Sequence, residues 1–181
     1  CTLARALQAY GDAGGAEAAF DVAEAMGSRV SPGIRAYAAA VRAELWIAQD
    51  RLEDAGGWAS RQGLNSTDRP TFANRFAYIT LARLLIAQGR TRDAEALLAR
   101  LLALCQSTGA TGDLIVVLVL QASAWFRRGR REQALTVLQR ALALAQPEGH
   151  LTIFTQAGPS IHKILQAEVS CGRDSGYASR L

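Results

Sequence analysis

Apolar residues recur at helical spacing along most of this chain, with polar residues between them. The clearest segments are Ala73–Ala87 and Leu114–Phe126, where apolar positions return every three or four residues. Glycines and short polar stretches separate these segments, and the most polar connection is Gly63–Pro70. The pattern predicts helices near residues 2–10, 15–27, 33–49, 52–62, 71–88, 91–107, 112–128, 131–146 and 159–170.

The same arrangement returns every 39 or 40 residues. Each copy has a turn residue, from which we number the other positions: Gly11, Asp50, Gly89 and Gly129. Alanine stands at position +5 in every copy: Ala16, Ala55, Ala94 and Ala134. Alanine also stands at position −7: Ala4, Ala43, Ala82 and Ala122. A bulky apolar residue stands at position −4: Leu7, Trp46, Leu85 and Trp125. Columns in one register across four copies indicate an internal repeat.

Each repeat predicts two antiparallel helices joined by a tight turn. The turn residue ends the first helix in a left-handed backbone conformation, which suits glycine and which Asp50 adopts more readily than most residues do. Small alanines at −7 and +5 let the two helices approach closely, and the large residue at −4 fills the gap between neighbouring repeats. Because such hairpins stack into a superhelix, we predict an all-α fold, a right-handed α-solenoid.

We expect the 181 residues to form a single helical-repeat domain, since their number is typical of one domain. Its repeats span approximately residues 1–30, 31–69, 70–109 and 110–149, and residues 150–181 form a C-terminal cap. The chain starts at Cys1 already in a helical pattern, so we expect it to be a fragment of a longer protein.

The composition agrees with a helical protein and excludes several other classes. The chain has 35 Ala, 23 Leu and four Pro, which excludes a β-sandwich or a collagen-like chain. Three scattered cysteines are too few for a disulfide scaffold. The uncharged run Leu114–Trp125 is about half as long as a membrane span, so we expect a cytoplasmic protein without membrane association.

The net charge of +4 comes from 19 Arg and one Lys against 16 acidic residues. Basic and acidic residues are interspersed along most helices, whereas nucleic-acid binders concentrate positive charge on one face. One dense cluster contains Arg127, Arg128, Arg130 and Arg131. We interpret it as a solvated helix end favoured by the helix dipole, with a patch for phosphate or an acidic partner as the alternative. We therefore expect no direct DNA binding by this chain.

The Gly-x4-Ala core between apolar helices resembles the tetratricopeptide repeat, and its best copies lie at residues 81–105 and 121–149. The second copy runs into HLTIFTQAGPSIHKIL at residues 150–165. This stretch, with the PEG turn before it, looks like the end of the superhelical sensor region in MalT-like, LuxR-type transcriptional regulators.

The resemblance implies an effector-sensing, non-catalytic module that binds a small-molecule inducer or a regulatory protein and thereby favours an oligomeric, active state. It also implies an ATPase module and a helix-turn-helix domain in the full-length chain; no G-x-x-x-x-G-K-[ST] stretch occurs here. The resemblance is also compatible with self-association of this part. The alternative function is a tetratricopeptide-type scaffold for protein–protein interaction, not linked to transcription.

In the tetratricopeptide pattern, positions −13, −6, −3 and −2 line the concave face. Aromatic walls with a few charged residues among them suit a ligand groove. We expect the inducer or partner to contact residues at these positions: Tyr37, Glu44, Phe76, Arg83, Ser123, Phe126 and Arg127. The alternative is that some of them pack against the neighbouring helix. If they line an open groove, the stability of the fold depends little on them.

No arrangement of residues predicts catalysis, a cofactor or a metal site. His150, His162 and Cys171 are spaced by 12 and 9 residues, which does not match a metal-ligand motif. Cys105 lies on an apolar stripe and is expected in the core, as are Trp46 and Trp125. Gly56 and Gly57 are expected to interrupt the second helix of their repeat, which leaves the Trp58 ring partly exposed.

Overall fold

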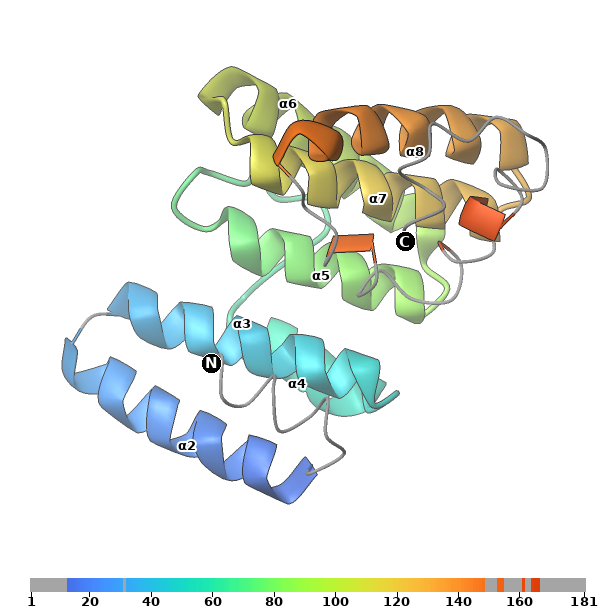
Figure 1. Cartoon of the computed structure of the whole chain (residues 1–181). Helices are drawn as coiled ribbons and strands as arrows, with labels where there is room; N and C mark the ends of the chain where they lie inside the picture. Colours follow the sequence, from blue (N-terminus) through green and yellow to red (C-terminus); the bar gives the residue numbers. More distant parts are fainter. Residues whose placement is uncertain (1–12, 31, 149–152, 155–160, 162–163, 167–181) are drawn as a thin grey trace.

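The structure is a computed structural model that describes residues 13–30, 32–148, 153–154, 161 and 164–166. The predicted helix at 2–10 and most of the one at 159–170 lie outside these residues. Within them, the regular secondary structure is helical (Figure 1). The elements are α2 (Ala13–Val30), α3 (Pro32–Ala48), α4 (Leu52–Arg61), α5 (Arg75–Ala87), α6 (Thr91–Thr108), α7 (Thr111–Arg127), α8 (Arg131–Ala145) and the 3-10 helix η1 (Gln146–Glu148).

Consecutive helices pair as hairpins, α3 with α4, α5 with α6 and α7 with α8, and α2 packs against α3 (Figure 1). The first helices of the three hairpins also pack in a row, α3 against α5 and α5 against α7. This stacking of helical hairpins is the predicted α-solenoid.

The turns have the predicted left-handed conformation. The φ angle is 61° at Asp50 and 77° at both Gly89 and Gly129. In each turn the next residue donates its N–H to the carbonyl of the bulky residue at −4: Arg51 to Trp46 at 2.8 Å, Arg90 to Leu85 at 2.8 Å and Arg130 to Trp125 at 3.0 Å. This bond satisfies a carbonyl at the end of the first helix, and the same arginine then precedes the second helix. Gly11 lies outside the described residues.

The alanine columns form the close contacts within and between hairpins. Every described member has zero exposed surface: Ala16, Ala55, Ala94, Ala134, Ala43, Ala82 and Ala122. A larger side chain at any of these positions would have to displace a packed neighbour, since protein interiors leave few voids. At position −4, Leu85 is buried, whereas Trp46 and Trp125 are half-buried against the core.

Two local expectations were wrong. The helix expected from residue 71 begins at Arg75, because the Asn74 side chain turns back and its Oδ1 accepts the Thr71 N–H at 2.7 Å. The helix α4 continues through Gly56 and Gly57, and the Trp58 ring is buried at 2% exposure rather than partly exposed. Two helical glycines cost about 1–2 kcal/mol together, and burial of the large apolar Trp58 ring acts against this cost, while its Nε1 has no hydrogen-bond partner within the described residues.

The core consists of three clusters arranged along the stack. The largest joins α3, α4, α5, α6 and α7 around Leu97 and Leu101. A second surrounds Leu138 and Phe154, and a small third one contains Phe20 and Val41. Phe76 packs against the first and third clusters, and Leu102 and Leu114 pack against the first and second. Few side chains therefore connect adjacent clusters.

No helix of the described residues has the length and apolar character needed to cross a membrane. Cys105 is in the core, as expected, at 1% exposure. Its burial raises the pKa of the thiol, and the nearby Asp113 carboxylate raises it further.

Candidate functional site

Equivalent residues of adjacent repeats meet on one surface of the row α3, α5 and α7. We call this surface the first-helix face and define it by positions −13 and −6: Tyr37, Phe76, Val116, Glu44, Arg83 and Ser123. At −13, the Tyr37 and Phe76 rings lie 4.6 Å apart with their planes inclined by 42°. Tyr37 is 46% exposed, whereas Phe76 and Val116 are half-buried against the core. The two aromatic residues thus form an exposed apolar contact between α3 and α5.

At position −6, the charged residues of the same two helices form an ion pair. The Arg83 Nε lies 3.2 Å from Glu44 Oε1, and the side chains are 24% and 16% exposed. The Arg83 Nε is buried and has no hydrogen bond of good geometry within the described structure. Arg83 and Glu44 therefore form a partly desolvated ion pair on the first-helix face.

The other three predicted residues lie on α7. Ser123 is buried at 6% exposure, and Phe126 is half-buried against the second cluster. Arg127 is exposed at the end of the helix. The structure thus brings together Tyr37 with Phe76 and Glu44 with Arg83, and it places the α7 residues further along the stack.

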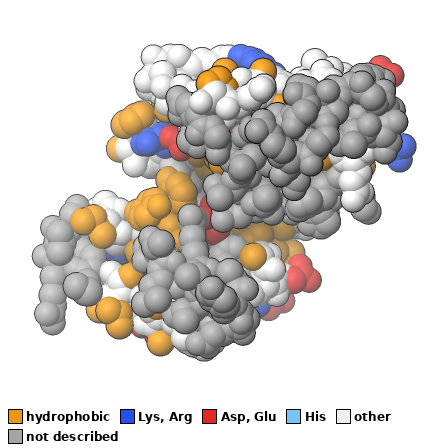
Figure 2. All heavy atoms as spheres, in the orientation of Figure 1, with side chains coloured by type: hydrophobic (Ala, Val, Ile, Leu, Met, Phe, Trp, Pro, Cys, Tyr) orange, Lys and Arg blue, Asp and Glu red, His pale blue; other side chains and the backbone are white. Residues whose placement is uncertain are grey.

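Four residues next to the predicted site escaped the sequence reasoning. Ile34 and Phe72 are 49% and 51% exposed. Ile34 stands one helical turn before Tyr37 on α3, and Phe72 stands four residues before Phe76, in the connection that precedes α5; this spacing was the available signal. The Arg75 guanidinium stacks on the Phe72 ring at 3.8 Å and forms an ion pair with Asp113 of α7. Figure 2 shows hydrophobic side chains gathered between the α2–α3 part and the α5–α8 part of the molecule.

A charge network joins α2 to the next hairpin. Glu17, at position +6 of the first repeat, accepts hydrogen bonds from Trp46 Nε1 at 2.9 Å, Arg42 Nε at 2.9 Å and Arg51 Nη1 at 2.8 Å. Burial alone would raise the pKa of Glu17, but these bonds outweigh it and hold the pKa below its ordinary value. The residues satisfy one another, so we assign this network to packing between repeats rather than to a ligand.

The connection between α4 and α5 is held by its own polar contacts. Asp68 Oδ2 accepts the Asn65 N–H at 2.8 Å and the Tyr78 hydroxyl at 2.8 Å. Arg100 of α6 donates to the Asp68 carbonyl at 2.9 Å and also to the Ser66 carbonyl. Burial raises the pKa of Tyr78 to about 12, with help from the Asp68 hydrogen bond. These hydrogen bonds therefore hold the most polar segment of the sequence in a defined conformation.

The arginine cluster divides into different environments. Arg128 is half-buried, and its Nη1 donates to Glu95 Oε2 at 2.6 Å. Arg127, Arg130 and Arg131 are exposed. Within the described part of the chain, no group of three or more His, Cys, Asp and Glu side chains is placed to hold a metal ion. His150, His162 and Cys171 lie outside that part.

Comparison with known protein families gives a match for this chain. A family model described as a MalT-like TPR region matches residues 1–170 of the 181. No curated protein matches the chain. The family match includes every described helix, and its tetratricopeptide repeats agree with the observed hairpins.

Proposed function

The chain belongs to the MalT-like TPR family, and on this premise we propose that it is the effector-sensing module of a bacterial LuxR-type, MalT-like transcriptional regulator. In this proposal the module works in the cytoplasm and binds a small-molecule inducer or a regulatory protein. The ATPase and helix-turn-helix domains belong to adjoining parts of the full-length regulator, and this module neither binds DNA nor catalyses a reaction.

The observation that carries the proposal is the exposed contact between Tyr37 and Phe76. Side chains buried between helices would be ordinary packing, but Tyr37 keeps 46% of its surface accessible. Aromatic residues with an apolar ring and few degrees of freedom are well suited to recognition. A ligand that covers this ring removes apolar surface from water at about 25 cal/mol per Å².

The Arg83–Glu44 pair adds polarity to the same surface. The pair is partly shielded from solvent, so a hydrogen bond from Arg83 to a ligand contributes about 1.5–3 kcal/mol. An effector with an apolar part over Tyr37 and a hydrogen-bond acceptor near Arg83 would use both features. Binding across α3 and α5 would fix the relative position of two adjacent repeats.

The test is a thermal-shift screen of neutral sugars, amino acids and nucleosides, followed by calorimetric titration of each hit. Tyr37→Ala is the informative variant because the exposed side chain contributes little to the fold. Val22→Ala is the matched control, since Val22 is 59% exposed but lies on α2. We expect Tyr37→Ala to weaken binding about tenfold or more and Val22→Ala to leave it unchanged.

Equal binding by wild type and Tyr37→Ala would place the effector site elsewhere. If the screen finds no small molecule and a protein is captured through the same surface, the tetratricopeptide-type scaffold is the better description. A full-length sequence without a helix-turn-helix domain would contradict the link to transcription.

A further inference from the structure

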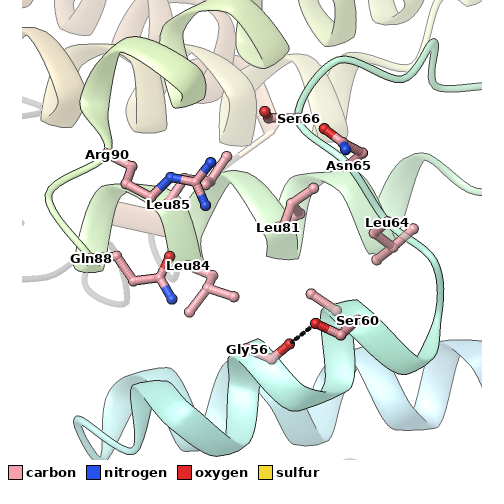
Figure 3. Close-up of a pocket in the computed structure, with 11 residues that line it drawn as sticks. Gly56, Ser60, Leu64, Asn65, Ser66, Leu81, Leu84, Leu85, Gln88 and Arg90 are labelled. Carbon is pink, nitrogen blue, oxygen red and sulfur yellow. Dashed lines mark hydrogen bonds between the residues drawn. The ribbon is translucent and has the colours of Figure 1, made fainter.

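A pocket of about 310 Å³ lies between α4, α5 and the connection that joins them (Figure 3). Gly56 and Ser60 of α4 form one wall, and Leu81 and Leu85 of α5 form another. Gln88 and Arg90 lie at one end of the pocket, and Leu64 lies at the other, in the ordered connection (Figure 3). The volume is at the lower end of the range for small-molecule sites, about 300–1,000 Å³.

The pocket exists because one repeat lacks a side chain that its neighbours have. At position +6 the first repeat has Glu17 and the third has Glu95, but the second has Gly56. In both neighbours the +6 carboxylate reaches an arginine of the following repeat. Glu17 Oε1 accepts from Arg51, at position +1, at 2.8 Å, and Glu95 Oε2 accepts from Arg128, at position −1, at 2.6 Å. The second repeat therefore has a vacant carboxylate position.

The basic residue that would receive this carboxylate is present. Arg90 occupies position +1 of the third repeat, as Arg51 does in the second. Both pair with the aspartate three residues later, Arg51 with Asp54 and Arg90 with Asp93. Arg51 binds Glu17 in addition, whereas within the described structure Arg90 has Asp93 as its carboxylate partner and no counterpart of Glu17. Arg90 lines the pocket instead.

We propose that this pocket binds a small organic carboxylate with a short apolar chain. The carboxylate takes the place of the missing +6 side chain and accepts hydrogen bonds from Arg90 and the Gln88 amide. The apolar chain lies against Leu64 and Leu81. An ionised acceptor is favoured here because hydrogen bonds between charged groups are about twice as strong as neutral ones.

This site is separate from the proposed effector site. Successive helical residues are rotated by about 100°, so Leu85 points about 200° away from Arg83, which it follows by two positions on α5. The pocket thus opens on another side of α5 than the first-helix face. The carboxylate proposal stands whether or not an effector binds across Tyr37 and Phe76.

The probe is hexanoate, with 1-hexanol as its uncharged counterpart, titrated into the ¹⁵N-labelled protein. We expect saturable amide shifts at Ser60, Leu64 and Gln88 with millimolar hexanoate, and much weaker ones with hexanol. Absence of saturable shifts with hexanoate would overturn the proposal. Equal affinity for hexanol would also overturn it, because the pocket would then be selecting apolar surface alone.

Gly56→Glu is the decisive variant because it restores the side chain of the neighbouring repeats. A Cβ at residue 56 would lie 3.8 Å from Gln88 Nε2, an ordinary van der Waals distance. We expect Gly56→Glu to abolish hexanoate binding and to raise the melting temperature. Gly112→Glu is the matched control, since a Cβ there meets nothing within 4 Å, and it should bind like wild type. Unchanged binding by Gly56→Glu would overturn the assignment.

A second variant provides an independent test if Gly56→Glu does not fold. Arg90→Gln should weaken hexanoate binding about tenfold, as expected for loss of a charged hydrogen bond. Arg92→Gln changes a nearby exposed arginine that does not line the pocket, and it should have no effect. If the two arginine variants bind equally well, Arg90 is not the receptor for the carboxylate and the proposal fails.

Discussion

Asp50 and Gly89 occupy the same place in consecutive repeats, and both have a left-handed backbone, with φ angles of 61° and 77°. A residue with a Cβ loses roughly 1–2 kcal/mol in this conformation, aspartate less than most, whereas glycine does not. The second repeat therefore carries a strain that the third does not, although the hydrogen bond that closes the turn is 2.8 Å long in both.

This difference predicts opposite effects of two substitutions. Gly89→Ala should lower the free energy of unfolding by about 1–2 kcal/mol, and Asp50→Gly should raise it by up to about 1 kcal/mol. Gly112→Ala, in α7 at an unstrained position, should stabilise slightly because alanine favours the helix. Urea unfolding followed by circular dichroism measures all three. Destabilisation by Asp50→Gly would show that the aspartate side chain contributes more than its backbone strain costs.

The alanine columns predict sensitivity to larger side chains. Ala94 has no exposed surface, so Ala94→Leu should overpack the contact and lower the free energy of unfolding by about 1–3 kcal/mol. Ala96, two residues later on the same helix, is exposed, and Ala96→Leu should change stability by less than about 0.5 kcal/mol. Thermal melts compare the two. Equal melting temperatures would contradict the role given to the +5 column.

The contact between Glu95 and Arg128 predicts different effects for adjacent arginines. Arg128→Met leaves the partly buried Glu95 carboxylate without its cation, and we expect a loss of about 1.5–3 kcal/mol in the free energy of unfolding. Arg127→Met, at the exposed neighbour, should be nearly neutral. Chemical denaturation of both variants measures these losses. A similar loss in the two would mean that stability depends on net charge rather than on the pair of Glu95 and Arg128.

The contact between Asp68 and Tyr78 predicts a pH dependence at both ends of the scale. Hydrogen bonds from the Asn65 N–H and the Tyr78 hydroxyl hold the pKa of Asp68 below its ordinary value. A group whose pKa is lowered by folding stabilises the fold at pH values above its unfolded pKa. This contribution is lost as the pH falls through its folded pKa. The connection between α4 and α5 should therefore loosen only in strong acid, below about pH 4.

At the alkaline end the sign is reversed. The Tyr78 pKa is raised to about 12, so its contribution is complete below the ordinary value near 10 and is lost as pH rises towards 12. Ultraviolet titration of tyrosinate should show a late phase that Tyr78→Phe removes. Tyr78→Phe should also lower the free energy of unfolding by about 1–2 kcal/mol. A Tyr37→Phe control should leave the late phase intact, and its loss in that control would contradict the assignment.

The sequence predicted the hairpins well because the same residue pattern occurs in several repeats, which distinguishes it from chance. Any one alanine is uninformative, but alanine at one register of each repeat indicates a close helix contact, and Ala55, Ala94 and Ala134 are fully buried. The start of α5 was missed because it depends on one hydrogen bond to the Asn74 side chain. The burial of Trp58 was missed because it depends on tertiary packing. Neither has a counterpart in the other repeats.

The sequence predicted the candidate site only as a set of equivalent repeat positions. The −13 and −6 registers predicted that Tyr37 and Phe76, and Glu44 and Arg83, would share one surface. They did not predict how far each side chain is covered. Phe76 packs against two core clusters, so truncating it costs stability as well as any binding, contrary to the expectation for an open groove. The sequence alone did not predict the pocket beside Gly56. It became evident when the second repeat, which lacks a carboxylate at +6, was compared in space with the first and third repeats.

The division of the core into three clusters has a consequence for how the chain opens. In a linear stack each unit is stabilised by its own packing and by its two neighbours, and cooperativity depends on the junctions. Phe76 is one junction, and Leu102 with Leu114 is another. Helix α2 can therefore exchange its amide protons in a partial opening that leaves the cluster around Leu97 and Leu101 closed. We therefore expect the solenoid to open as linked segments, with these apolar side chains and the hydrogen bonds of Glu17 at the junctions.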